Sequence, residues 1–170
     1  MMQRVKQFYR ALTARLTPAD KKWVAESLPS AAQQLFYAMH PADQYHVLQV
    51  AKTALRLWAD KQAGDKDLLL RAALLHDVGR VQGDMDIAGK VAAVLVQHFF
   101  PSGAEKLAKS RKGWLGHVMY VYYHHPEIGA VKVETLGFKQ EAALIRCHHA
   151  KPKADDPPEL VLLRRADELN

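Results

Sequence analysis

The chain has 170 residues, of which 49% are hydrophobic, and this size and composition fit one domain with a sizeable buried core. Its net charge of +6 is compatible either with an anionic ligand, phosphate first of all, or with a solvated basic surface. The single cysteine excludes an internal disulfide, and the longest apolar run, Val91–Val96, is far shorter than the roughly twenty residues of a membrane helix.

Hydrophobic residues recur at helical spacing almost throughout the chain. Residues 5–16 carry the first apolar stripe and predict the first helix. Thr17 and Pro18, with Asp20 three residues after the threonine, predict the N-cap and first turn of a second helix.

The next three predicted helices have recognisable boundary signals. Ser30 and Gln33 form a capping-box pattern that opens the first of them. The second follows Pro41 and stops near Gly64, because glycine is common just after a helix end. The third is strongly apolar and runs from about residue 67 to Gly79.

Five further helices follow from periodicity and from proline and glycine punctuation. They are Ile87–Phe99, Trp114–His124, Pro126–Leu136, Lys139–His149 and Pro158–Leu169. No segment combines sustained strand alternation with hairpin turns. We therefore predict one all-α domain over residues 1–170, with N-terminal helices in residues 1–40.

Several polar residues fall where a helix should face the core. His76 and Asp77 close the most apolar helix, where they would either cap the helix or coordinate a cation. His46 lies on an apolar stripe, and Asp167 lies on the inward face of the last helix. An inward carboxylate is costly unless it is paired with Arg or His or bound to metal, so both alternatives stay open.

The order His…His-Asp…His…His-His…Asp resembles the HD-domain superfamily of metal-dependent phosphohydrolases. Five ordered segments between residues 43 and 169 carry the resemblance: the helix of His46, AALLHDVGR at 72–80, HPEIGA at 125–130, IRCHH at 145–149 and LRRAD at 163–167. The family signature commonly ends in Lys where this chain has Arg80. The resemblance implies a compact all-α HD-domain helical bundle with residues 43–169 as its metal-binding core.

The resemblance also implies a centre for divalent metal ions, with two ions expected from among Fe, Mn, Ni, Co and Mg. The implied ligands are His46, His76, Asp77, His125, one or both of His148 and His149, and Asp167. In that scheme Asp77 bridges the two ions. His46, His76 and Asp167 complete one site, and His125 with His148 or His149 completes the other. Two close metals suit hydrolysis at phosphorus, because they acidify a shared water and neutralise phosphate oxygens.

His76, Asp77 and Arg80 are the expected catalytic residues. Arg80 would contact a phosphate, although a role as a cation at a helix C-terminus is the open alternative. The expected substrate is a small phosphorylated molecule, most simply a nucleotide, which would be cleaved by a phosphomonoesterase, phosphodiesterase or diadenosine-polyphosphate hydrolase activity. A di-iron oxygenase and a non-catalytic nucleotide sensor are the alternatives.

The chain departs from parts of this family. The GYP motif of the cyclic-di-GMP phosphodiesterase branch is missing, because Ala-Lys-Pro-Lys follows His149, and this disfavours that branch. The long span between Asp77 and His125 predicts a helical insert over about residues 86–112 that shapes the pocket. We expect a cytoplasmic protein, monomeric or homodimeric, that binds neither membrane nor nucleic acid.

Overall fold

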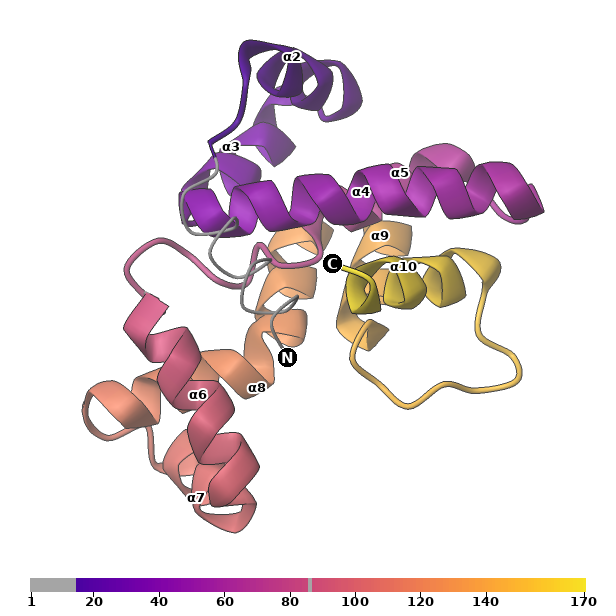
Figure 1. Ribbon diagram of the computed structural model, residues 1–170. Coiled ribbons are helices and arrows are strands. Elements are labelled where there is room, and N and C mark those ends of the chain that lie inside the picture. Colours follow the sequence, from indigo (N-terminus) through magenta and orange to yellow (C-terminus); the bar gives the residue numbers. More distant parts are fainter. Residues whose placement is uncertain (1–14, 86) are drawn as a thin grey trace.

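The computed structural model describes residues 15–85 and 87–170, and within these ranges it contains nine helices and no strand (Figure 1). In chain order the helices are α2 (Pro18–Ser27), α3 (Ser30–Ala38), α4 (Pro41–Lys61), α5 (Lys66–Leu75), α6 (Ile87–Phe99), α7 (Pro101–Ser110), α8 (Gly113–Thr135), α9 (Lys139–Cys147) and α10 (Pro158–Glu168). The all-α prediction is confirmed. The helix predicted over residues 5–16 falls almost wholly outside the described residues. No helix of the described part is both long and apolar enough to cross a membrane.

The two predicted helix starts, the N-cap at Thr17 and the capping box at Ser30, have different outcomes. Thr17 and Asp20 form the reciprocal side-chain and backbone hydrogen bonds of a capping box at the start of α2. The box predicted from Ser30 is wrong, because Ser30 is already helical and Pro29, which has no side-chain acceptor, occupies the N-cap. The Gln33 side chain instead donates to a backbone carbonyl of the preceding loop at 2.8 Å.

The main core lies between α2, α3, α4, α5, α9, α10 and the second half of α8. Helix α4 packs against α5 and α10, while α9 packs against α8 and α5. The largest fully buried hydrophobic side chains of this core are Phe36, Met39, Leu48, Leu69, Leu74, Leu75, Ile145 and Leu163. This packing brings the C-terminal ends of α5 and α9 next to the middle of α8 and the inner faces of α4 and α10.

Helices α6 and α7 form a separate unit with the first half of α8. Figure 1 shows α6 and α7 set apart from α4, α5, α9 and α10. The unit has its own small core of Met85, Ala93, Ala104, Ala108, Val118, Met119 and Val121. The insert expected over residues 86–112 is therefore helical, and α7 is an additional helix that the sequence pattern did not separate.

Helix α8 corrects the prediction of two helices divided at residue 125, because it continues through Pro126. A proline in a helix interior lacks the N–H that would bond to the carbonyl four residues earlier, here that of Tyr122. The Nδ1 atom of His125 lies 2.9 Å from this carbonyl and donates to it instead. A side chain therefore replaces the missing backbone donor, which reduces the cost of the proline.

Candidate metal centre

The structure brings all seven predicted ligands into one cluster. His46 comes from α4, His76 and Asp77 from the end of α5, His125 from the middle of α8, His148 and His149 from the end of α9, and Asp167 from α10. They form three overlapping groups in which all ligand atoms lie within 4.8 Å of one another: His46, His76 and Asp77; His76, His148 and Asp167; and His125, His148 and His149. His148 belongs to two of these groups and connects them.

Three of the imidazole rings are oriented by the same local device. In each case Nδ1 donates to the backbone carbonyl three residues earlier: His76 to Ala73 at 2.8 Å, His125 to Tyr122 at 2.9 Å and His148 to Ile145 at 2.6 Å. A carbonyl oxygen can only accept, so Nδ1 carries a proton in each ring and Nε2 is the nitrogen that faces the cluster, with a free lone pair wherever the ring is neutral. This is the arrangement in which backbone oxygens fix the tautomer of a metal-binding histidine.

Helices α5 and α9 end earlier than predicted, which places two of these rings at helix ends. Helix α5 ends at Leu75 rather than Gly79, and α9 ends at Cys147 rather than His149. His76 and His148 are the C-cap residues. The His76 ring takes up the Ala73 carbonyl, and the His148 ring shares the Ile145 carbonyl with the backbone N–H of His148.

Buried ligand atoms in the cluster lack hydrogen-bond partners. Nε2 of His76, Nε2 of His148 and Oδ1 of Asp77 are all inaccessible to solvent and unpartnered among the described residues. Leaving one such group unsatisfied costs about 1–3 kcal/mol. Cations bound within the cluster would satisfy these atoms, and imidazole nitrogens with carboxylate oxygens suit first-row transition metals. The residues present therefore fit a metal centre.

Asp77 lies between the groups and turns one oxygen to each side. Its Oδ2 is 4.0 Å from Nε2 of His46 and 3.8 Å from Nε2 of His76. Its Oδ1 is 3.4 Å from Nε2 of His125. This geometry is what a bridging carboxylate requires.

Asp167 closes the cluster from the C-terminal helix. Its Oδ1 lies 3.1 Å from Nε2 of His46 and 3.7 Å from Nε2 of His76. The inward carboxylate recognised in the sequence is therefore surrounded by histidines and has no arginine partner among the described residues. The sequence predicts that Asp167 is paired with Arg or His or bound to a metal. The structure shows pairing with histidine, and the same arrangement of atoms is compatible with a bound metal.

His148 and His149 are both in the cluster but differ in burial. His148 is 3% exposed and its ring is fixed by Ile145, whereas His149 is exposed. Their ring centroids are 4.0 Å apart, and both rings lie beside His125. His148 therefore has the more rigid ligand geometry, and His149 lies at the open side of the cluster.

The electrostatic environment divides the histidines into two kinds. Burial alone would lower the pKa of His76, but the carboxylates of Asp77 and Asp167 outweigh it and raise that pKa to about 9. Burial and the neighbouring His76 and His149 lower the pKa of His148 to about 3. Burial and the Arg80 guanidinium hold the pKa of His125 well below its ordinary value. His125 and His148 are therefore neutral at pH 7, the form that binds metals.

Arg80 turns into the cluster. Its guanidinium lies 2.8 Å from Oδ2 of Asp77 and 2.9 Å from Nε2 of His125. Burial would raise the pKa of Asp77, but the charge of Arg80 and of the neighbouring histidines holds it well below its usual range. Arg80 therefore contacts the oxygen that Asp77 turns to His46 and His76, and also the Nε2 atom of His125 in the other group.

Gly79 is a site residue that sequence reasoning treated only as a helix stop. A Cβ atom at this position would lie 2.0 Å from the backbone oxygen of His125, far inside van der Waals contact. Only glycine lets the turn after Asp77 approach α8 this closely. The HDVG turn and the His125 segment therefore define the distance between the two halves of the cluster. The sequence shows the glycine, but it does not show the contact, because the backbone of His125 lies 46 residues away in the chain.

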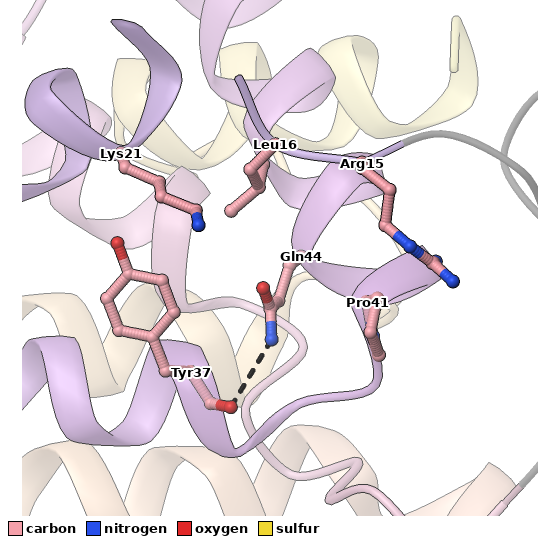
Figure 2. A pocket seen from close by; sticks show the side chains of 6 residues that line it. All are labelled: Arg15, Leu16, Lys21, Tyr37, Pro41 and Gln44. Atoms are coloured by element: carbon pink, nitrogen blue, oxygen red, sulfur yellow. Dashed lines mark hydrogen bonds between the residues drawn. The ribbon is translucent and has the colours of Figure 1, made fainter. Parts of the chain in front are cut away.

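A cavity of about 470 Å³ opens beside the cluster, and its lining residues are Arg80, Gln97, Tyr122, Tyr123, His125, Pro126 and His149. A second cavity, of about 380 Å³, lies where the segment before α2 meets α3 and α4 (Figure 2). Its lining residues are Arg15, Leu16, Lys21, Tyr37, Pro41 and Gln44, none of which is a histidine or a carboxylate. In Figure 2 the Arg15 guanidinium points away from the other labelled side chains, so the cavity does not focus its positive charge. The first cavity is therefore the one that belongs to the metal centre.

Comparison with known proteins gives one match. The model of the HD domain family matches residues 44–170. No curated protein and no solved structure matches the chain significantly. The matched region contains every predicted ligand from His46 to Asp167, and the match confirms the resemblance to the HD-domain superfamily.

Proposed function

The chain belongs to the HD domain family, and on this premise we propose that it is a metal-dependent phosphohydrolase acting on a small phosphorylated molecule, with nucleotides as the expected class. Family membership implies a metal-dependent, hydrolase-type protein; the reaction and substrate are our proposal. The observation that carries it is Asp77, a buried carboxylate that turns one oxygen to each of two histidine groups.

The ligand arrangement supports two ions. His46, His76 and Asp167 would hold one, and His125 with His148 and His149 would hold the other. Asp77 would bind both. Divalent ions bound there would lower the pKa of a water molecule and neutralise charge on phosphate oxygens.

The other residues of the cluster prepare the reacting groups. Backbone carbonyls hold the rings of His76, His125 and His148 so that their Nε2 atoms keep their direction throughout the reaction. Arg80 presents a planar, permanently charged guanidinium to the cavity, a group that binds phosphate oxygens in a fixed geometry. In the structure Asp77 and His125 hold this guanidinium at the cavity wall.

Arg80 also favours this function over a di-iron oxygenase with the same ligands. An anionic substrate gains from a cation in the cavity wall, whereas O₂ activation has no need of one. A non-catalytic nucleotide sensor would use the same cavity but would not require Asp77 to face two ligand groups.

The test is a screen of phosphorylated metabolites with protein loaded separately with Mn²⁺, Mg²⁺, Fe²⁺, Co²⁺ or Ni²⁺, with released phosphate as the readout. We expect phosphate release that depends on the metal and is lost in Asp77→Asn. Oxygen consumption by the iron-loaded protein is measured in parallel. Oxygen consumption without phosphate release would support the oxygenase, and nucleotide binding without either reaction would support the sensor.

A further inference from the structure

The cavity beside the metal centre has two chemically different walls. Arg80, His125 and His149 form the wall that belongs to the metal centre. Gln97 on α6, with Tyr122 and Tyr123 on α8, forms the other. The second wall comes from the separate α6–α8 unit, and its residues are not metal ligands.

The outer wall offers aromatic surface and an oriented amide. The rings of Tyr122 and Tyr123 stand nearly perpendicular, at 88°, with centroids 5.5 Å apart. The Tyr123 hydroxyl donates a short hydrogen bond to Oε1 of Gln97. This bond uses the amide oxygen and leaves the amide N–H groups as the side that can donate to a ligand.

This wall is held in place relative to the metal ligands. Tyr122, Tyr123 and His125 lie within one turn of the continuous helix α8, and the Tyr122 carbonyl itself holds the His125 ring. An ion pair between the partly exposed Lys90 and the buried Asp43 ties α6 to α4. The two walls therefore form a rigid site of fixed width, and such a site binds without a large ordering cost.

We propose that Gln97, Tyr122 and Tyr123 form the subsite that selects the organic group esterified to the substrate phosphate, and that this group carries a flat aromatic ring with hydrogen-bonding edges, as a nucleoside carries its base. The inference rests on the proposed function and specifies it, because Arg80 and the metal centre would take the phosphate while the outer wall takes the base. Stacking of a base on an aromatic side chain contributes about 1–3 kcal/mol, and the Gln97 amide adds discrimination between base edges. A sugar phosphate or a short inorganic phosphate chain would leave this wall without a contact.

The test compares ligands that differ only in the base. Binding of AMP, GMP, CMP, UMP and ribose 5-phosphate to the metal-loaded protein is measured by titration calorimetry. We expect at least one nucleotide to bind about tenfold or more tightly than ribose 5-phosphate. In Gln97→Ala and Tyr123→Phe this advantage should fall by about fivefold or more, with affinity for ribose 5-phosphate unchanged.

Two neighbouring residues provide matched controls. Tyr120 lies on the same helix but contacts Arg111 instead of the cavity, and His98 is the exposed neighbour of Gln97. Tyr120→Phe and His98→Ala should keep the wild-type preference. The inference is overturned if ribose 5-phosphate binds as tightly as all four nucleotides, or if the wall variants weaken both ligand types equally.

Phosphate release, measured with the same ligands, separates this inference from the proposed function. Hydrolysis without preference for a base would support the proposed phosphohydrolase activity and contradict the proposed base subsite. Selective nucleotide binding without hydrolysis would support the base subsite and contradict the phosphohydrolase activity.

Discussion

Nε2 of His46 lies 3.1 Å from Oδ1 of Asp167, although 121 residues separate the two in the chain. The contact joins α4 to α10, which pack along each other in the main core. The metal centre is therefore assembled only when the first and last helices of the matched region have docked. Packing of α4 on α10 therefore serves both the core and the site. His46 on α4 and Asp167 on α10 can approach each other only when the two helices are packed.

Gly79→Ala should damage the site through packing alone. The added Cβ would lie 2.0 Å from the His125 carbonyl oxygen, so the turn or α8 must move. We expect a loss of about 3 kcal/mol in the free energy of unfolding, measured by urea denaturation, together with weaker metal binding. Gly103→Ala is the control, because its Cβ meets only an ordinary contact at 3.7 Å in α7. Equal stability of the two variants would show that the close approach at Gly79 is unimportant.

His125→Ala should lower the metal content from two ions per chain toward one. His125 supplies a nitrogen to the group that it forms with His148 and His149, and the Tyr122 carbonyl fixes its ring. The group of His46, His76 and Asp77 does not include it. The measurement is elemental analysis after loading and desalting. His117→Ala on the same helix is the control, since His117 is exposed and its ion-pair partner among the described residues is Asp84, away from the cluster. Protein that never exceeds one metal ion would contradict the two-metal arrangement.

Arg80→Gln should have opposite effects on metal and substrate. The guanidinium contacts Oδ2 of Asp77 and Nε2 of His125, so its removal frees His125 for the second ion and relieves charge repulsion. We expect affinity for that ion to rise about tenfold by calorimetry. KM for the phosphorylated substrate should rise more than kcat falls, because a phosphate contact is lost. A lower affinity for the second ion would mean that Arg80 supports the metal instead of competing with it.

The stability of the chelator-treated protein should be greatest near pH 6.5. Above this pH the native state keeps a proton on His76 up to a pKa of about 9, while the unfolded state has lost it, so stability falls as pH rises. Below pH 6.5 the unfolded state protonates histidines that the native state keeps neutral, His148 down to a pKa of about 3, so stability falls as pH falls.

Each histidine contributes a slope of up to about 1.4 kcal/mol per pH unit, measured by urea unfolding between pH 5 and 9. His148→Gln should reduce the loss of stability below pH 6.5, and His76→Gln should reduce the loss of stability above pH 6.5. Stability that increases steadily from pH 6.5 to 9 would contradict the environment assigned to His76.

Most of the ligand set could be predicted because its members occur at recognisable places in the sequence. His46 and Asp167 lie on apolar helix faces, and His76 and Asp77 end an apolar helix, so each needed a polar partner. The continuity of α8 could not be predicted, because the group that compensates for Pro126 is a side chain, His125, and not a backbone N–H. The close packing of Gly79 on α8 is likewise a tertiary contact that no local pattern contains. The wall formed by Gln97 and Tyr123 required the positions of α6 and α8 in space.

The most direct test of the account is the turnover of Asp77→Asn on the phosphorylated substrate found by the screen, with metal content determined in the same samples. Asparagine keeps the size and one oxygen but loses the charge that faces two metal groups. Asp84→Asn, at a carboxylate that pairs with the exposed His117, is the control and should retain full activity. We predict that Asp77→Asn lowers kcat by about three orders of magnitude or more. Undiminished turnover in Asp77→Asn would contradict the proposed mechanism.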